Sequence, residues 1–134
     1  MIGMTRDEYI DKEMKMHYVH EKEVKGIDLP GRNWKKLIDT ETSGCRNMIF
    51  GVVTFPPGSD PGTHAHVNEE EIIYVLSGKG ETRVGDKVYP LEPGVAVFTE
   101  PGIAHGVKTL GTEPLVLVSV FSPPVRPGSY DKKK

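Results

Sequence analysis

Short segments rich in β-branched and aromatic residues alternate along the chain with Gly and Pro turn signals. Apolar segments of this length, bounded by turn residues, are typical of β-strands. The dipeptide Gly85-Asp86 separates two of them and indicates a tight hairpin. Strands are therefore predicted at 48–55, 71–78, 80–85, 87–92, 95–100 and 114–122.

Many short strands and few helices predict an all-β sandwich or barrel. The pattern favours a helix only near the start, where Thr5 and Glu8 form a capping box. Segments 16–24 and 33–38 predict strands of an N-terminal arm, and prolines make the C-terminal end a poor strand. The expected division is helix and arm over 1–40, barrel over 41–122 and a flexible tail over 123–134.

Length and charge narrow the possible functions. A chain of 134 residues builds one domain around one core. Its 17 Lys and Arg against 19 Asp and Glu give a net charge of −2, which argues against binding to nucleic acid or membrane surfaces. Cys45 is the single cysteine, so an intramolecular disulfide is excluded. Without a signal peptide or a stretch of roughly 18 apolar residues, we expect a cytoplasmic protein.

Two histidines one residue apart precede three consecutive glutamates and a predicted strand. Residues two apart on an extended chain share a face, so the side chains of His64 and His66 can converge on one point. Glu71 begins the following strand, and His105 comes just after a Pro-Gly turn. Three imidazoles and one carboxylate would form a mixed nitrogen and oxygen site that suits a divalent transition metal.

Each part of this pattern also has a more ordinary explanation. A His-X-His pair in a loop is more often solvated than bound to a metal. Consecutive glutamates are usually exposed, and this is expected for Glu69 and Glu70. A third histidine placed after a turn changes the balance, and the combination favours a metal site.

The same residues resemble the first motif of the cupin superfamily, which reads G(X)5HXH(X)3–4E(X)6G. Every fixed position is matched, by Gly58, His64, His66, Glu71 and Gly78. The resemblance extends over about residues 46–122, and it implies a small single-domain cupin. The fold it implies is an antiparallel double-stranded β-helix, the jelly-roll barrel.

The second cupin motif, G(X)5PXG(X)2H(X)3N, is matched only in part. Gly94, Gly102 and His105 are in register, but Glu100 stands at the proline position and Thr109 at the asparagine position. The proline affects the geometry of the turn rather than the ligands. The resemblance implies that one divalent transition metal per chain, Fe, Mn, Ni, Cu or Zn, is bound by His64, His66, Glu71 and His105.

Same-face parity predicts the wall of the substrate pocket. Residues two and four positions after a ligand lie on the same face of a strand as that ligand. These are Ile73 and Val75 after Glu71, and Val107 and Thr109 after His105. The strand at 48–55 can face inward in either register. The predicted pocket residues are mostly apolar: Phe50, Ile73, Val75, Val107 and Thr109.

Two arginines, Arg46 and Arg83, are the basic residues best placed to meet a substrate carboxylate, although each is more often a solvated strand residue. No second acid-base group is apparent near the four ligands, which disfavours isomerase and decarboxylase chemistry. We therefore predict a mononuclear metal-dependent enzyme of dioxygenase type that acts on a small organic substrate.

Alternatives remain, because cupins of this size include isomerases, decarboxylases, lyases and pure binding proteins, and a fold alone does not choose among them. A non-enzymatic module that binds or senses a small molecule is the alternative from a different class. We also expect a homodimer, because a second subunit would cover the apolar outer face and the sheet edges.

Overall fold

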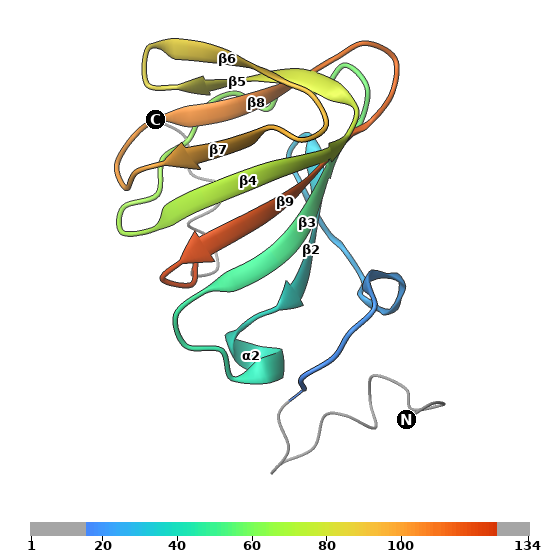
Figure 1. Cartoon of the computed structure of the whole chain (residues 1–134), viewed down its shortest axis with the longest axis vertical. Helices are drawn as coiled ribbons and strands as arrows, with labels where there is room; N and C mark the ends of the chain where they lie inside the picture. The colour runs from blue at the N-terminus through green and yellow to red at the C-terminus, as the bar shows by residue number, and fades with distance from the viewer. Residues whose placement is uncertain (1–15, 126–134) are drawn as a thin grey trace.

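The computed structural model describes residues 16–125. The helix predicted near Thr5 and most of the predicted tail lie outside the described residues. Figure 1 shows strands joined mostly by short connections, a longer loop over 56–69 between β3 and β4, and two brief helical turns. In chain order the elements are η1 Glu21–Glu23, β1 Ile27–Leu29, β2 Arg32–Ile38, α2 Thr40–Ser43, β3 Ile49–Phe55, β4 Glu70–Ser77, β5 Lys79–Val84, β6 Lys87–Leu91, β7 Ala96–Thr99, β8 His105–Leu110 and β9 Leu115–Ser122.

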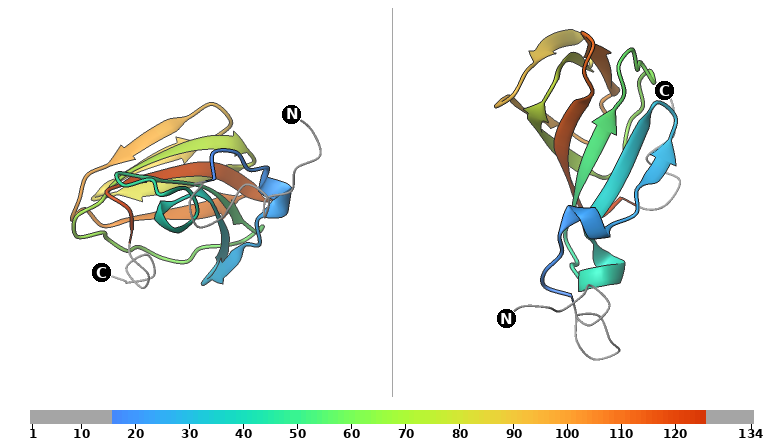
Figure 2. Two further views of the ribbon diagram at one scale, coloured as in Figure 1. Left: turned by 90° about the horizontal axis from the view of Figure 1, so that it is seen from below. Right: turned by 90° about the vertical axis from the view of Figure 1, so that its right-hand side faces the viewer.

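The strands form two sheets. The large sheet has the strand order β1-β2-β3-β9-β4-β7, and the small sheet has the order β6-β5-β8. Neighbouring strands in both sheets are antiparallel. The small sheet lies beside the curved large sheet, and together they form an open barrel (Figures 1 and 2). The all-β antiparallel prediction is confirmed.

Every strand predicted from 48 onward overlaps an observed strand, and 33–38 falls within β2. The prediction of a strand at 16–24 is wrong, because the described chain forms the 3-10 turn η1 there. His20 Nδ1 accepts a hydrogen bond from the Lys22 amide at 3.1 Å, and Glu23 Oε1 accepts one from the His20 amide at 3.3 Å. Such local side-chain bonds compete with strand pairing.

Three elements lie outside the predicted segments: β1, α2 and β8. β1 pairs with β2 across a tight turn in which Gly31 has a φ of 71°. α2 is capped by Asp39, whose Oδ1 accepts from the Thr42 amide at 2.9 Å, and it ends at Gly44 with a φ of 76°. Among the described residues, no helix has the length and apolar character needed to cross a membrane.

The core lies between the inner faces of the two sheets. Along β9, Leu115, Leu117, Ser119 and Phe121 are buried and alternate with partly exposed residues. This period of two is expected for a strand with one face on the core. The buried apolar residues that pack together include Trp34, Ile49, Val53, Phe55, Ile73, Val75 and Leu91.

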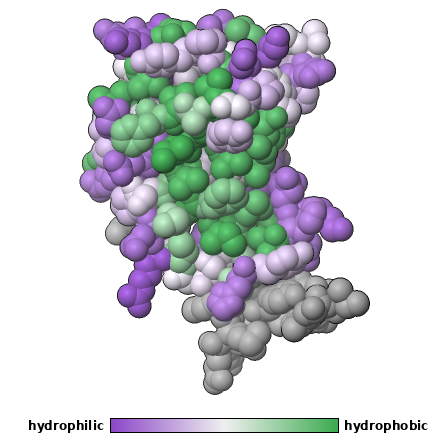
Figure 3. Space-filling model, in the orientation of Figure 1, coloured by the Kyte–Doolittle hydropathy of each residue, from purple (hydrophilic) through white to green (hydrophobic). Residues whose placement is uncertain are grey.

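The opposite face of the large sheet carries exposed apolar side chains. In the antiparallel register, Ile72 lies beside both Phe98 and Val120, and Val120 lies beside Phe50. Figure 3 shows hydrophobic residues gathered over this side of the molecule. We call the set the outer apolar patch, made up of Phe50, Ile72, Tyr74, Leu76 and Phe98.

Candidate metal centre

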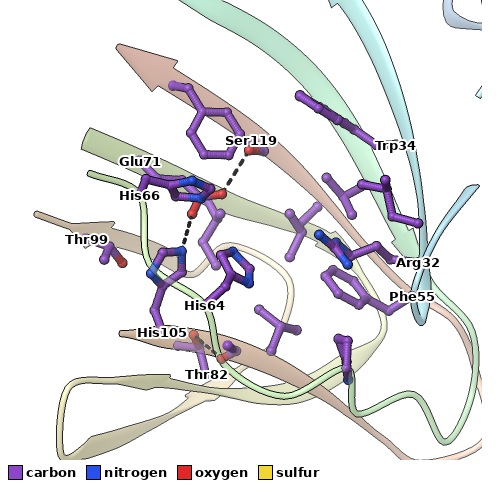
Figure 4. A pocket seen from close by; sticks show the side chains of 18 of the residues that line it. Arg32, Trp34, Phe55, His64, His66, Glu71, Thr82, Thr99, His105 and Ser119 are labelled. Carbon is purple, nitrogen blue, oxygen red and sulfur yellow. Dashed lines mark hydrogen bonds and ion pairs between the residues drawn. The ribbon is translucent and has the colours of Figure 1, made fainter. Parts of the chain in front are cut away.

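Three histidines from two segments distant in the chain meet inside the barrel. His64 and His105 form an isolated antiparallel bridge, in which each amide donates to the other residue's carbonyl at 2.9 and 2.8 Å. His66 follows two residues later in the same extended segment, so its side chain returns to the same side. Each of the three offers a ring nitrogen, and these atoms lie within 4.8 Å of one another (Figure 4).

A glycine beside His105 allows this close approach. A Cβ placed at Gly106 would clash with the carbonyl oxygen of Gly62, so only glycine lets the loop before His64 lie against β8. Thr82 Oγ1 donates to the Gly106 carbonyl at 2.9 Å from β5. The backbone itself therefore fixes the distance between the two histidine segments.

Glu71 brings a carboxylate to the histidine cluster from the start of β4. Its Oε1 lies 2.9 Å from His105 Nε2, and its Oε2 accepts a hydrogen bond from Ser119 Oγ at 3.0 Å. Ser119 is 1% exposed on the neighbouring strand β9, where Glu71 is paired with Phe121. Ser119 thus holds one oxygen of the carboxylate, and the other oxygen points toward the imidazole of His105.

The tautomer of His105 follows from its second nitrogen. Nδ1 lies 2.9 Å from the carbonyl oxygen of Ile103, an arrangement in which Nδ1–H donates. In the neutral ring, Nε2 then presents a lone pair to the carboxylate of Glu71. Two facing lone pairs repel each other unless a proton or a cation lies near both, so this geometry favours either a proton on Nε2 or a bound cation.

Several of these nitrogens have no hydrogen-bond partner within the described part of the chain. Both ring nitrogens of His66 are buried and have none, and the buried Nε2 of His105 has only its contact with Glu71. Burying polar atoms without partners costs about 1–3 kcal/mol each. A metal bound by the cluster would use Nε2 of His105 and one nitrogen of His66. The residues present therefore fit a divalent transition metal.

Burial controls the protonation of the cluster. It lowers the pKa of His64 to about 3, and the neighbouring His105 and His66 act in the same direction. Burial also lowers the pKa of His66. Burial lowers the pKa of His105 as well and raises that of Glu71, but the contact between the two groups outweighs burial. The pKa of His105 is therefore raised and that of Glu71 is lowered. Neutral imidazoles and an ionised carboxylate are the forms that bind metals.

The four residues line a cavity (Figure 4). Ile73 and Val107 line it, as the strand parity predicts. Val75 and Thr109 are buried but are not among the lining residues. Phe50 must be corrected, because it is 38% exposed on the outer face of β3, while Val53 and Phe55 of the same strand face the cavity.

Other residues of the cavity are missing from the sequence-based prediction. Arg32, Trp34 and Ser119 line it from β2 and β9, whereas Arg46 and Arg83 are exposed and are not among its lining residues. The turn residues Leu29-Pro30-Gly31 directly precede Arg32. They could have indicated that the chain reverses there and that a strand begins at Arg32. Neither arginine proposed from the sequence faces the histidines.

One expectation about the glutamate run is also corrected. Glu70 is exposed, but Glu69 is only 8% exposed. Its Oε1 accepts a hydrogen bond from the Asn68 amide at 3.4 Å. The loop before β4 turns the Glu69 side chain back toward the protein. Its charge alone therefore did not predict whether it is exposed.

Comparison with known proteins places the chain in a family. Residues 51–121 match the family described as Cupin domain. The oxalate-binding protein of Thermotoga maritima is 32% identical over 85 residues, which are 63% of this chain and 70% of that protein. The L-ectoine synthase of Vibrio cholerae serotype O1 is 37% identical over 95 residues, 69% of this chain and 67% of the enzyme.

Solved structures agree with the sequence match. The crystal structure of a predicted oxalate decarboxylase from Thermotoga maritima superposes with a TM-score of 0.72 at 26% identity. The superposition covers 79% of this chain and 98% of that structure. The family match spans more than half of the chain, from β3 to β9. The protein belongs to the cupin domain family.

Proposed function

We propose that this cupin is a mononuclear metal-dependent enzyme whose metal is bound by His64, His66, Glu71 and His105. The observation that supports the proposal is the convergence of three imidazoles and one carboxylate at a cavity, with buried ring nitrogens left without hydrogen-bond partners among the described residues. The substrate is a small organic molecule that reaches the metal through its oxygen atoms.

A divalent metal at this position supplies Lewis-acid or oxygen-activating chemistry. The chain's own residues position the ligands: Ser119 orients the Glu71 carboxylate, and the Ile103 carbonyl fixes the ring of His105. Phe55, along with other apolar lining residues, keeps the surroundings dry. A dry site strengthens the electrostatic interactions within it.

The reaction type we propose is dioxygenase-like oxidation. Among the described residues that line the cavity, the four proposed ligands are the only carboxylates and imidazoles. An isomerase, decarboxylase or lyase needs a separate proton donor or acceptor within reach of its substrate. A water or a ligand residue would have to take that role here, and this favours oxidation.

A second candidate is binding without catalysis. It is supported by the relative named as an oxalate-binding protein, which is 32% identical over the matched region. Another relative, L-ectoine synthase, carries the name of an enzyme. The two names show that proteins similar to this chain include both kinds.

Elemental analysis of protein purified without chelators or a metal-affinity column tests the metal. Oxygen uptake with small diketones, phenols and thiols then tests the reaction. Iron, copper or manganese near one per chain with substrate-dependent uptake supports the dioxygenase type. Zinc or nickel without uptake points to isomerase, lyase or decarboxylase chemistry. A chain that binds no metal after reconstitution contradicts the proposal.

A further inference from the structure

Hydroxyl groups in the cavity lie close to the proposed metal or already have partners. Among the described lining residues, the hydroxyls are those of Thr82, Thr99 and Ser119. Thr82 Oγ1 donates to a backbone carbonyl at 2.9 Å, and Ser119 Oγ donates to the carboxylate of Glu71 at 3.0 Å. In Figure 4, Thr99 lies beyond His105, at the metal side of the cavity. None of the three hydroxyls is placed to bind a substrate group far from the metal.

Arg32 is the remaining charged side chain of the described cavity lining, besides the proposed ligands. It begins β2 directly after the β1–β2 turn. Its Nη1 donates to the Pro30 carbonyl at 2.8 Å in a hydrogen bond that is exposed to solvent, and the residue makes a further interaction of its own. The guanidinium is therefore engaged at the exposed side of the hairpin.

The inner face of the large sheet gives the cavity an apolar wall. Trp34, Val53 and Leu117 line the cavity, and they lie side by side in the register of β2, β3 and β9. All three are buried. A Cβ placed at Gly51 would lie 2.6 Å from Trp34 Nε1, so the indole covers this glycine and extends the wall along the strands.

The apolar wall continues as far as the proposed metal. The rings of Trp34 and Phe121 are T-shaped with centroids 6.0 Å apart, and the rings of Phe121 and His66 are T-shaped at 4.9 Å. Ile73, two residues after Glu71 on β4, lines the same cavity. A substrate that binds the metal through one end would rest its other end on carbon atoms.

The volume of the cavity limits the size of that other end. It is about 60 Å³, against roughly 150 Å³ for an engineered cavity that binds benzene. A hydroxyl or a charge on a group enclosed by these walls would lose its hydration without gaining a partner, and this weakens binding. The walls therefore favour an aliphatic group that is smaller than a benzene ring.

We propose that the substrate has a metal-chelating oxygen group at one end and a short aliphatic group at the other, and that Trp34, Val53 and Leu117 select the aliphatic end. The inference rests on the proposed function, because the chelating end requires the metal at the three histidines and the glutamate. The metal then binds any chelating head of the right geometry, and the wall distinguishes among the groups attached to it.

Titration calorimetry of hydroxamic acids on the metal-loaded protein tests the inference, because these compounds share one chelating head and differ in the attached group. Acetohydroxamate, propionohydroxamate and butyrohydroxamate form a series of increasing chain length. Each affinity is divided by the affinity of the same compound for the aqueous metal ion. The ratio should rise about 4-fold per added methylene, as expected for the burial of one CH2 group. Benzohydroxamate should bind more weakly than butyrohydroxamate, because its ring exceeds the cavity.

A second comparison tests the apolar character of the wall. The compound 3-hydroxypropanohydroxamate has as many non-hydrogen atoms as butyrohydroxamate but ends in a hydroxyl. It should bind about 10- to 100-fold more weakly, the range for an added hydroxyl in an apolar pocket.

Two variants identify the residue responsible. Val53→Thr keeps the size of the side chain and adds a hydroxyl to the wall. It should reduce the difference between these two compounds by about 5-fold, the contribution of one hydrogen bond, while leaving the metal content unchanged. Val88→Thr, the same substitution at an exposed position of β6 outside the cavity lining, is the matched control and should keep the full difference.

The outcomes separate this inference from the proposed function. A wild-type protein that takes up no metal contradicts both. Normal metal content with no binding of hydroxamates, with affinity independent of chain length, or with equal affinity for the hydroxyl compound overturns the inference and leaves the metal centre standing. A folded, metal-loaded Val53→Thr that keeps the full difference also overturns it. If this variant does not fold, the two comparisons on the wild-type protein still decide.

Discussion

His105 Nε2 and Glu71 Oε1 lie 2.9 Å apart, at the point where β8 and β4 face each other across the barrel. This contact raises the pKa of His105 and lowers that of Glu71, because it favours a protonated imidazole beside an ionised carboxylate. Nδ1 of the same ring is taken by the Ile103 carbonyl. A metal ligated by both groups would take the place of a proton on Nε2 as the positive charge beside the carboxylate.

Replacing His105 with Ala should therefore abolish metal binding or sharply weaken it. The ring supplies one of the proposed ligands, and removing it also frees the carboxylate of Glu71 from its partner. Metal per chain, measured by elemental analysis after dialysis against the free ion, should fall well below the wild-type value. A metal-dependent rise in melting temperature should vanish with it, because a ligand stabilises only the state that binds it.

The matched control is His17→Ala, which removes an exposed histidine outside the cavity lining. Its metal content and its metal-dependent stabilisation should equal those of the wild-type protein. An unchanged metal content in His105→Ala would remove His105 from the ligand set.

Ser119→Ala should weaken metal binding without unfolding the protein. Ser119 Oγ holds the Glu71 carboxylate at 3.0 Å, and hydrogen bonds behind a ligand typically contribute about 10- to 100-fold in metal affinity. Competition with a chelator of known affinity measures the change. Ser77→Ala on the exposed end of β4 is the control. Equal affinities in the two variants would mean that Ser119 does not position the carboxylate.

The metal ligands could be proposed from sequence because a local rule pairs two of them and the motif spacing resembles that of a known family. Two histidines two residues apart share a face of any extended segment, and this holds whichever strand they join. The backbone bridge between His64 and His105 then brings the third ring into place. Motif spacing indicated the residues, but their burial and the unpartnered nitrogens could only be found in the folded chain.

The pocket could be predicted only in part, because it depends on pairing between distant segments. Strand parity gave Ile73 and Val107 correctly, since each shares a strand with a proposed ligand. β3 contains no proposed ligand from which inward positions could be counted. Its pairing with β9 decides that Val53 faces inward and Phe50 outward. Arg32 enters through β2, whose place beside β3 no local pattern specifies.

The homodimer expected from the sequence stays a prediction, and the outer apolar patch is the surface that we expect it to use. The patch has no charged member, and it lies on the face of the large sheet that points away from the cavity, so pairing would leave the site open. Two copies would bury on the order of 1,000 Å2, near the lower limit of specific interfaces. Light scattering at micromolar concentration should give twice the chain mass of 14.8 kDa.

Phe98→Lys should convert that dimer to a monomer, because the interface would have to bury a charge on the edge strand β7. Val88→Lys is the matched control, since Val88 is also 48% exposed but lies on β6 of the small sheet. The control should remain a dimer. A wild-type monomer, or a dimer that survives Phe98→Lys, would contradict the use of this face.

Acid should destabilise the metal-free protein, with His64 as a main cause. Its pKa falls from 6.5 to about 3 on folding, so between these values the unfolded chain binds more protons than the folded one. Stability is then lost as the pH falls through this window. The lowered pKa values of His66 and Glu71 act in the same direction, while the raised pKa of His105 acts against them.

Urea unfolding of chelator-treated protein at pH 7 and pH 5 measures the effect. His64 alone would account for a loss of roughly 2 kcal/mol between these two values, since each proton contributes about 1.4 kcal/mol per pH unit. His64→Gln removes the titrating ring and should show a smaller loss by about that amount. His17→Ala, at an exposed histidine, should show the same loss as the wild-type protein. If His64→Gln and the wild-type protein lose stability equally, then folding does not lower the pKa of His64, and other groups cause the loss of stability in acid.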